Sequence, residues 1–355
     1  MTKRFFAGGN TVRGFFSYFD NILPTKKANR LFLLKGGPGT GKSSLMKDIM
    51  ARIEDFDYSL ELCQCSSDKN SLDGVLIKDK SVLIVDATAP HAMDQKIPGI
   101  ADEIANLGAF IDDGILSKYK KEIITINDEK SDSYSTAYHY LSCLDGIAKS
   151  TEAINAKYFT KRDAINVAKS IIKSIDITPP QRVGTERKLF LSAITADGII
   201  NHVETLAELA GKTIVLSTST NINTGDVISR IAEHLIENGF DIETYYSAFA
   251  PESAIEHLYV EELGLFVTTK NKYIDYNYLK NDWIINLDTG IMDKVDIETL
   301  EDNFELTDSI LKKAIKSLNR ARDLHANLEK FYIESMDFTH MDDIAISIVG
   351  KINSF

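Results

Sequence analysis

The eight residues from 36 to 43 read Gly-Gly-Pro-Gly-Thr-Gly-Lys-Ser, and they constrain the fold more than any other stretch of the chain. They follow the apolar run 31–34 and precede a segment, 45–53, whose apolar residues recur at helical spacing. This order predicts a strand over 31–35, a glycine-rich turn and a helix over about 43–54. Successive glycines allow backbone N–H groups to surround an anion, and a helix N-terminus adds partial positive charge. The segment is therefore expected to bind phosphate groups.

Each residue of this Walker A, or P-loop, pattern has an expected role in binding ATP and Mg²⁺. Lys42 supplies a positive charge to the β- and γ-phosphates, and the Ser43 hydroxyl ligates Mg²⁺. The residues expected to contact the nucleotide are Gly36, Gly37, Pro38, Gly39, Thr40, Gly41, Lys42, Ser43 and Ser44. Further along, the apolar run 81–86 ends in Asp86, a Walker B pattern in which the carboxylate holds Mg²⁺ through water. Lys42 and Asp86 are accordingly the main catalytic candidates.

Three further side chains are catalytic candidates, each with a structural alternative. Asp68, or its neighbour Asp73, follows the predicted strand 58–65 and could act as a general base or could cap a turn. His91 follows the next strand, at the sheet edge where ligands of α/β folds bind, and could act on the γ-phosphate or serve only as a hydrogen-bonding partner. Arg13 lies in a glycine-rich turn and could cover the phosphates or be dispensable there.

An internal repeat with a period of about 180 residues divides the chain. Segments of the first half match segments of the second half in the same order and at a nearly constant offset. The matched pairs are 11–16 with 195–200, 31–34 with 213–216, 75–77 with 258–260, 82–84 with 265–267, and 157–159 with 330–332. Together with the helix-ending Pro179-Pro180, the repeat predicts two similar domains, residues 1–180 and 181–355.

The predicted fold class is α/β, built as tandem P-loop NTPase-like domains. In the first half, apolar and β-branched runs at 31–35, 58–65 and 81–86 alternate with helical segments, which predicts a parallel sheet flanked by helices. Long, charged, amphipathic segments at 110–175 and 303–350 predict a helical hairpin appended to each sheet.

The second half has lost the residues of the phosphate site while keeping the apolar pattern around it. Alignment places Thr224 opposite Lys42, Gly225 opposite Ser43 and Thr269 opposite Asp86. Loss centred on one site predicts a single competent nucleotide site and a degenerate second domain. That domain could still bind an anion weakly through Ser219 and Thr220, or bind a partner. It could also lend an arginine, such as Arg187 or Arg230, to the phosphates of the first site.

The composition limits the cellular location and the partners that are expected for this protein. The 355 residues contain no apolar run of transmembrane length, and the basic N-terminus lacks the apolar stretch of a signal peptide. The three cysteines do not make a disulfide framework, which indicates a cytoplasmic location. A net charge of −12 without a long Lys/Arg block disfavours nucleic acid as a partner. The expected partners are the nucleotide and a protein bound through the second domain or the helical hairpins.

From residue 36 to residue 43 and at Asp86, the chain resembles the P-loop NTPase superfamily. Over its whole length it resembles a family of uncharacterised bacterial tandem P-loop ATP-binding proteins, through the segments 8–11, 65–68, 86–91 and 331–338. The resemblance implies nucleotide binding and no particular biological role. The residues at 224, 225 and 269 depart from a tandem with two competent sites.

The favoured hypothesis is a slow Mg²⁺-dependent ATPase or ATP-driven switch, in which positioning and electrostatic stabilisation promote transfer of phosphate to water. One alternative is a small-molecule kinase, with Asp68 or Asp73 facing an acceptor hydroxyl. Another is a non-enzymatic regulator that binds nucleotide and a protein partner. ATP is favoured over GTP because the chain has no Asn-Lys-x-Asp guanine-binding motif. Ala87 stands where AAA-type motors carry a glutamate, so a carboxylate for hydrolysis must come from elsewhere.

Overall fold

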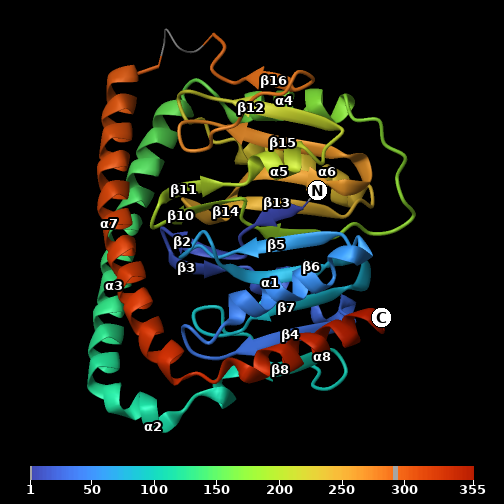
Figure 1. Cartoon of the computed structure of the whole chain (residues 1–355). Coiled ribbons are helices and arrows are strands. Elements are labelled where there is room, and N and C mark those ends of the chain that lie inside the picture. The colour runs from blue at the N-terminus through green and yellow to red at the C-terminus, as the bar shows by residue number, and fades with distance from the viewer. Residues whose placement is uncertain (1, 291–294) are drawn as a thin grey trace. The chain divides into compact units, whose positions relative to one another are not determined.

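The computed structural model describes residues 2–290 and 295–355, which form two compact units (Figure 1). The first unit comprises Met1–Gly8, Ser17–Ala137 and Ile315–Phe355, and the second comprises Gly9–Phe16 and Tyr138–Ala314. The units therefore differ from a single division between residues 180 and 181. The C-terminal segment packs with the N-terminal sheet, and residues 9–16 belong with the second unit.

The first unit contains a six-stranded mixed sheet. In spatial order its strands are β1 (Lys3–Phe5), β5 (Leu60–Gln64), β6 (Leu72–Ile77), β7 (Val82–Asp86), β4 (Arg30–Lys35) and β8 (Asp102–Asn106). The strands predicted at 31–35, 58–65 and 81–86 are confirmed as β4, β5 and β7. The prediction of a parallel sheet is wrong at β6, which runs antiparallel to both of its neighbours. The reason is the short connections on either side of β6, because parallel neighbours need a long crossover.

The second unit contains a six-stranded sheet with the same order. Its strands are β9 (Glu186–Leu189), β13 (Ile242–Ser247), β14 (Ala250–Val260), β15 (Leu265–Lys270), β12 (Lys212–Ser217) and β16 (Trp283–Asn286). Here β14 is the strand that runs antiparallel to both neighbours, as β6 does in the first sheet. The two sheets therefore match strand for strand, which is the arrangement that the internal repeat predicts.

A separate four-stranded sheet contains two further hairpins that match each other. Its strands are β11 (Gly198–Asn201), β10 (Ser192–Thr195), β2 (Gly8–Thr11) and β3 (Gly14–Ser17). In one hairpin the Thr11 hydroxyl donates to the Gly14 carbonyl, and Thr195 does the same to Gly198, both at 2.8 Å. Gly14 has a φ of 87° and Gly198 a φ of 110°, a backbone conformation that favours glycine. The repeated segments 11–14 and 195–198 are therefore tight turns.

The main helices of the first half are α1 (Lys42–Arg52), α2 (Asp113–Leu116), α3 (Lys120–Asn155) and α4 (Lys161–Lys173). Those of the second half are α5 (Val203–Ala207), α6 (Gly225–Glu237), α7 (Ile297–Ser335) and α8 (Met341–Asn353). Among the described residues, no helix combines the length and the apolar character needed to cross a membrane.

The predicted hairpins are wrong in their pairing, because each long helix lies beside a helix from the other half of the chain. In the first unit, Arg320 of α7 faces Glu129 of α3 at 3.4 Å. In the second unit, Asn303 of α7 donates to Ser150 of α3 at 3.2 Å. The shorter helices pack against other helices instead, α4 against α6 and α8 against α1.

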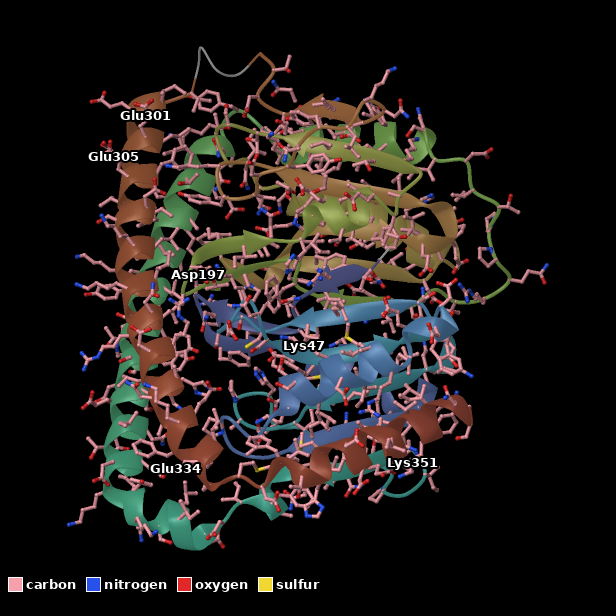
Figure 2. The ribbon with its side chains drawn as sticks, viewed as in Figure 1. Lys47, Asp197, Glu301, Glu305, Glu334 and Lys351 are labelled. Atoms are coloured by element: carbon pink, nitrogen blue, oxygen red, sulfur yellow. The ribbon has the colours of Figure 1, made fainter. Side chains whose placement is uncertain are left out.

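Helix α8 joins the core of the first unit through its apolar face. Ala345, Ile348 and Ile352 are buried in one cluster with Leu45, Met46 and Ile49 of α1. At the edge of this contact, Lys351 of α8, labelled in Figure 2, pairs with Glu103 of β8. The hydrophobic contact explains why the C-terminal segment belongs to the first unit.

Two isoleucines of α8 provide a test of this packing. Ile348 is 3% exposed, whereas Ile346 is 53% exposed. Ile348→Ala should lower the free energy of unfolding by about 2–5 kcal/mol, because it removes buried methylene groups and leaves a cavity. Ile346→Ala should change it by less than about 0.5 kcal/mol. Urea unfolding followed by far-UV circular dichroism measures both values, and equal effects would contradict the burial of this face of α8.

Candidate functional site

The glycine-rich loop, residues 36–43, connects β4 to α1. Gly39 and Gly41 have φ values of 71° and 86°, which lie in the left-handed region that favours glycine. The buried hydroxyl of Thr40 donates to the Gly37 carbonyl at 2.9 Å and closes the loop from within. The local sequence therefore specifies a tight loop at the helix N-terminus, where backbone N–H groups are left for a ligand.

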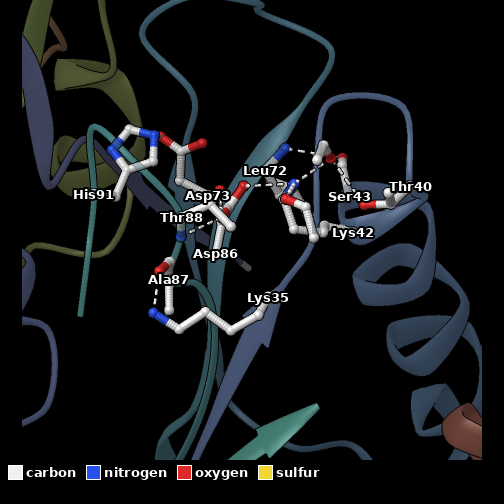
Figure 3. Close-up of polar contacts among 12 residues, drawn as sticks. Lys35, Thr40, Lys42, Ser43, Leu72, Asp73, Asp86, Ala87, Thr88 and His91 are labelled. Atoms are coloured by element: carbon white, nitrogen blue, oxygen red, sulfur yellow. Dashed lines mark hydrogen bonds and ion pairs between the residues drawn. The ribbon is translucent and has the colours of Figure 1, made fainter. Parts of the chain in front are cut away.

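Lys42 and Asp86 meet beside this loop (Figure 3). The parallel pairing of β4 with β7 sets Leu34 opposite Asp86, which places the carboxylate next to the loop. The Lys42 Nζ lies 3.7 Å from Asp86 Oδ2 and donates to the carbonyls of Gly36 and Gly37, each at 2.9 Å. Both charged side chains are largely shielded from solvent, at 11% and 16% exposure. A cation beside a glycine-rich loop at a helix N-terminus is an arrangement that binds an anion.

Oxygen atoms suited to Mg²⁺ lie around the same lysine. The Asp86 Oδ1 accepts from the Thr88 N–H and hydroxyl, at 2.9 and 2.5 Å, which leaves Oδ2 facing the loop. The Ser43 Oγ accepts from the Leu72 N–H at 3.0 Å. The described residues contain no cluster of three His, Cys, Asp or Glu that would hold a metal alone. Mg²⁺ at phosphate sites needs only one or two protein oxygens, with phosphates and water completing the shell, so Ser43 and Asp86 fit it.

Asp73 is a second buried carboxylate, near enough to Asp86 for that charge to raise its pKa. It lies at the start of β6, which pairs Gly74 with Val85, and it is 3% exposed. His91, in the loop after β7, has its Nε2 3.6 Å from Asp73 Oδ2. Burial raises the pKa of Asp73, whereas the nearby His91 lowers it. The sequence put Asp68 forward as the candidate with Asp73 as its alternative, and it is Asp73 that the structure places beside His91.

The remaining predicted residues lie outside this group. Both carboxylate oxygens of Asp68 are used in its own loop, accepting from the Asn70 N–H and the Ser71 hydroxyl at 3.0 and 2.5 Å. Ser44 is exposed on α1. Arg13 belongs to the second unit and faces Asp145 and Glu252 at 3.6 and 3.7 Å with its side chain half exposed.

The C-terminal end of α7 and the start of α8 pack against the glycine-rich loop. A Cβ on Gly37 would lie 2.6 Å from the Tyr332 ring, and one on Gly39 would lie 2.9 Å from the Glu329 carbonyl oxygen. Burial, and after it the charge of Asp68, raises the pKa of the Glu329 carboxyl, and Lys42 opposes the shift. Sequence reasoning missed this contact. The one sequence feature that pointed to this contact was the segment 331–338, which was used only as part of the family resemblance.

The second loop, residues 218–225, occupies the equivalent place in the second unit, between β12 and α6. Pairing of β12 with β15 sets Leu216 opposite Thr269, as Leu34 is set opposite Asp86. Thr224 and Thr269 are buried and share a hydrogen bond of 2.6 Å between their hydroxyls. A neutral pair of threonines therefore stands where the first unit has its lysine and aspartate.

The carboxylate of Asp288 fills the second loop. Its Oδ2 accepts from the Ser219 N–H and hydroxyl at 2.5 and 2.9 Å. Its Oδ1 accepts from the hydroxyls of Thr218 and Thr220 at 3.0 and 2.7 Å. The expectation that Ser219 and Thr220 bind an external anion is therefore wrong for this structure, because an internal carboxylate already engages both. The strand register matches Asp288 to Gly108, whose backbone N–H lies beside Gly36 in the first unit.

Comparison with known proteins adds no assignment. No family model, curated protein or solved structure matches the chain.

Proposed function

We propose that the first unit binds Mg²⁺–ATP at the glycine-rich loop and acts as a slow ATPase or ATP-driven switch with one competent site. The observation that carries the proposal is the meeting of Lys42 with Asp86 beside a loop that precedes a helix. In this proposal Lys42 neutralises the β- and γ-phosphates, and the backbone N–H groups of residues 36–43 bind their oxygens. Ser43 and Asp86 would hold Mg²⁺, which supplies further neutralisation of the phosphate charge.

The residues of the second unit support the proposal of one nucleotide site in the chain rather than two. The second unit's equivalents of Lys42 and Asp86 are Thr224 and Thr269, which carry no charge, and its equivalent of Ser43 is Gly225, which has no side-chain oxygen for Mg²⁺. Asp288 adds a carboxylate to the second loop, which would repel a nucleotide phosphate.

The contact between the glycine-rich loop and α7 supports the proposed function as an ATP-driven switch. Gly37 and Gly39 leave no room between the loop and Tyr332 or Glu329, so a change in the loop on nucleotide binding must be accommodated by the helix. A partner that contacts α7 would then distinguish the nucleotide-bound and nucleotide-free protein. The proposed protein partner is therefore one that binds this helix.

Dependence of nucleotide binding on Mg²⁺ tests the proposal. The protein should bind a fluorescent ATP analogue more tightly with Mg²⁺ than with EDTA, and it should release phosphate slowly. Asp86→Asn should weaken the Mg²⁺ effect about 10–100-fold, because the metal's partner loses its charge. Asp55→Asn, the same change at an exposed position after α1, should leave the Mg²⁺ effect unchanged. Absence of nucleotide binding by the unmodified protein would rule the proposal out.

A further inference from the structure

The repeat allows the loop after β7 to be compared residue by residue with the loop after β15. Pairing of Leu34 with Asp86 and of Leu216 with Thr269 makes Thr269 the equivalent of Asp86, and the residue five positions further on is His91 in the first unit and Ile274 in the second. The backbone hydrogen bonds of the two loops differ in direction: the His91 N–H donates to the Thr88 carbonyl at 2.8 Å, whereas the Asn271 N–H donates to the Ile274 carbonyl at 3.1 Å. A lysine also contacts each loop, although the two lysines belong to strands that are not equivalent, β4 in the first unit and β15 in the second. Lys35 donates to the Met93 carbonyl and Lys270 donates to the Tyr276 carbonyl, both at 2.7 Å. Ile274 of the second unit therefore stands where the first unit has His91.

This replacement groups His91 with the residues that the second unit has lost. Ile274 is 2% exposed and His91 is 9% exposed, so both fill a buried position. In the first unit the histidine ring packs on Phe19, with ring centres 4.6 Å apart. An apolar side chain fills the same position in the second unit, so packing alone does not explain the histidine of the first unit.

In contrast, both units have a carboxyl group at the position of Asp73, the residue that His91 faces. The pairing of Gly74 with Val85 and of His257 with Thr268 makes Glu256 the equivalent of Asp73. Burial raises the pKa of Glu256 to about 7, opposed by a hydrogen bond from Ser247. The first unit differs by placing a histidine at its buried carboxylate.

The carboxylate of Asp73 lies between His91 and the phosphate-binding residues (Figure 3). The charges of Asp86 and Lys42 both act on it, and so does the thiol of Cys65. Its Oδ2 accepts no hydrogen bond from the described residues, although it is buried. A buried oxygen in this condition is the kind of atom that binds a water molecule or a ligand. This oxygen is also the one that faces His91, whose Nε2 lies 3.6 Å away. The N–H of Leu72, the residue before Asp73, donates to the hydroxyl of the proposed Mg²⁺ ligand Ser43 at 3.0 Å.

We propose that Asp73 is the catalytic base for phosphoryl transfer at the glycine-rich loop, and that His91 is its positioning residue. The inference rests on the proposed function. The water oxygen forms a bond to the γ-phosphorus as the bond from that phosphorus to the bridging oxygen of ADP breaks. The proton of the water passes to the Asp73 carboxylate, and His91 holds that carboxylate in place from the side away from Lys42. Asp73 then supplies the carboxylate that is missing next to Asp86, where the chain has Ala87.

Two substitutions test the assignment when turnover and nucleotide affinity are measured separately. Asp73→Asn should lower kcat by about 100-fold, the scale of a lost general base, while the affinity for Mg²⁺–ATP stays within about threefold. His91→Ile copies the second unit, so the urea midpoint should be preserved while kcat falls by at least about tenfold. His139→Ile, at an exposed position of α3, should leave kcat, affinity and folding unchanged.

The possible outcomes separate this inference from the proposed function. Retention of kcat within about threefold in Asp73→Asn would overturn the assignment of the base. Parallel loss of affinity, turnover and urea midpoint in both variants would also overturn it, since that pattern marks a structural role. Binding of Mg²⁺–ATP by the unmodified protein without any phosphate release would overturn the assignment of Asp73 and leave the nucleotide site standing. Absence of nucleotide binding would refute the proposed function itself.

Discussion

Replacement of Lys42 by alanine is expected to lower the affinity for Mg²⁺–ATP by at least about 100-fold, close to the loss of measurable binding. Lys42 is the cation that stands over the glycine-rich loop, with its ammonium group on two loop carbonyls and 3.7 Å from Asp86. Without Lys42, one positive charge fewer would offset the repulsion between the triphosphate and the Asp86 carboxylate. Because the side chain is only 11% exposed, water screens this interaction weakly. Titration with a fluorescent ATP analogue in the presence of Mg²⁺ measures the effect.

Two controls show whether the effect belongs to this position. Lys47→Ala removes an exposed lysine from the same helix, labelled in Figure 2, and should leave the affinity within about twofold. Thr224→Ala changes the equivalent residue of the second unit and should also leave nucleotide affinity intact. Equal losses from Lys42→Ala and Thr224→Ala would refute the assignment of a single competent site.

Removal of the Asp288 carboxylate should produce the largest loss of stability in the second unit. Asp288→Ala leaves the hydroxyls of Thr218 and Thr220, together with the Ser219 N–H, without their acceptor in a buried loop. Unsatisfied buried donors are costly, and relief of the buried negative charge offsets part of this cost. We therefore expect the free energy of unfolding to fall by about 3 kcal/mol.

The single tryptophan of the chain gives this prediction a local probe. Trp283 lies in β16, five positions before Asp288, so its fluorescence should follow unfolding of the second unit. Asp302→Ala, at an exposed position of α7, serves as the control and should change the midpoint little. If Asp288→Ala leaves the urea midpoint of Trp283 fluorescence unchanged, the carboxylate does not hold the second loop together.

The two loops have the same place in matching sheets but differ in the side chains that surround them. Phosphate-binding loops leave N–H groups that need an anion. In the second unit that anion is Asp288, and the buried charge pair has become a hydrogen bond between Thr224 and Thr269. In the first unit Gly108 occupies the matching position and contributes no side chain. The second loop is therefore held by an internal carboxylate, and the first loop has no side chain at the matching position.

The second half of the chain also contributes to the first unit directly. Helices α7 and α8 come from the C-terminal half, yet they pack against the glycine-rich loop and α1. Loss of these helices would expose the apolar side chains of α1 and remove one wall of the loop. This dependence gives a physical reason for the presence of a second half that has lost its own charged site.

The sequence alone determined the parts of this protein that depend on neighbouring residues. The strand β4, the glycine-rich loop and α1 follow from apolar spacing and glycine conformation within about 25 residues, and the structure has them as expected. The repeat and the replacements at 224, 225 and 269 were also visible, because matching segments keep their order and offset.

Only the tertiary structure decided the contacts that join distant segments. Asp288 lies 70 residues from Thr218, and Glu329 reaches Gly39 from the other end of the chain. The sequence put Asp68 forward with Asp73 as its alternative, whereas in the structure Asp73, at the start of β6, lies beside His91 and Asp68 is bonded within its own turn. Apolar periodicity specifies which face of an element is buried, but not which distant element covers it. For that reason the glycine-rich loop between β4 and α1 could be predicted from the sequence, whereas the residues that surround it could not.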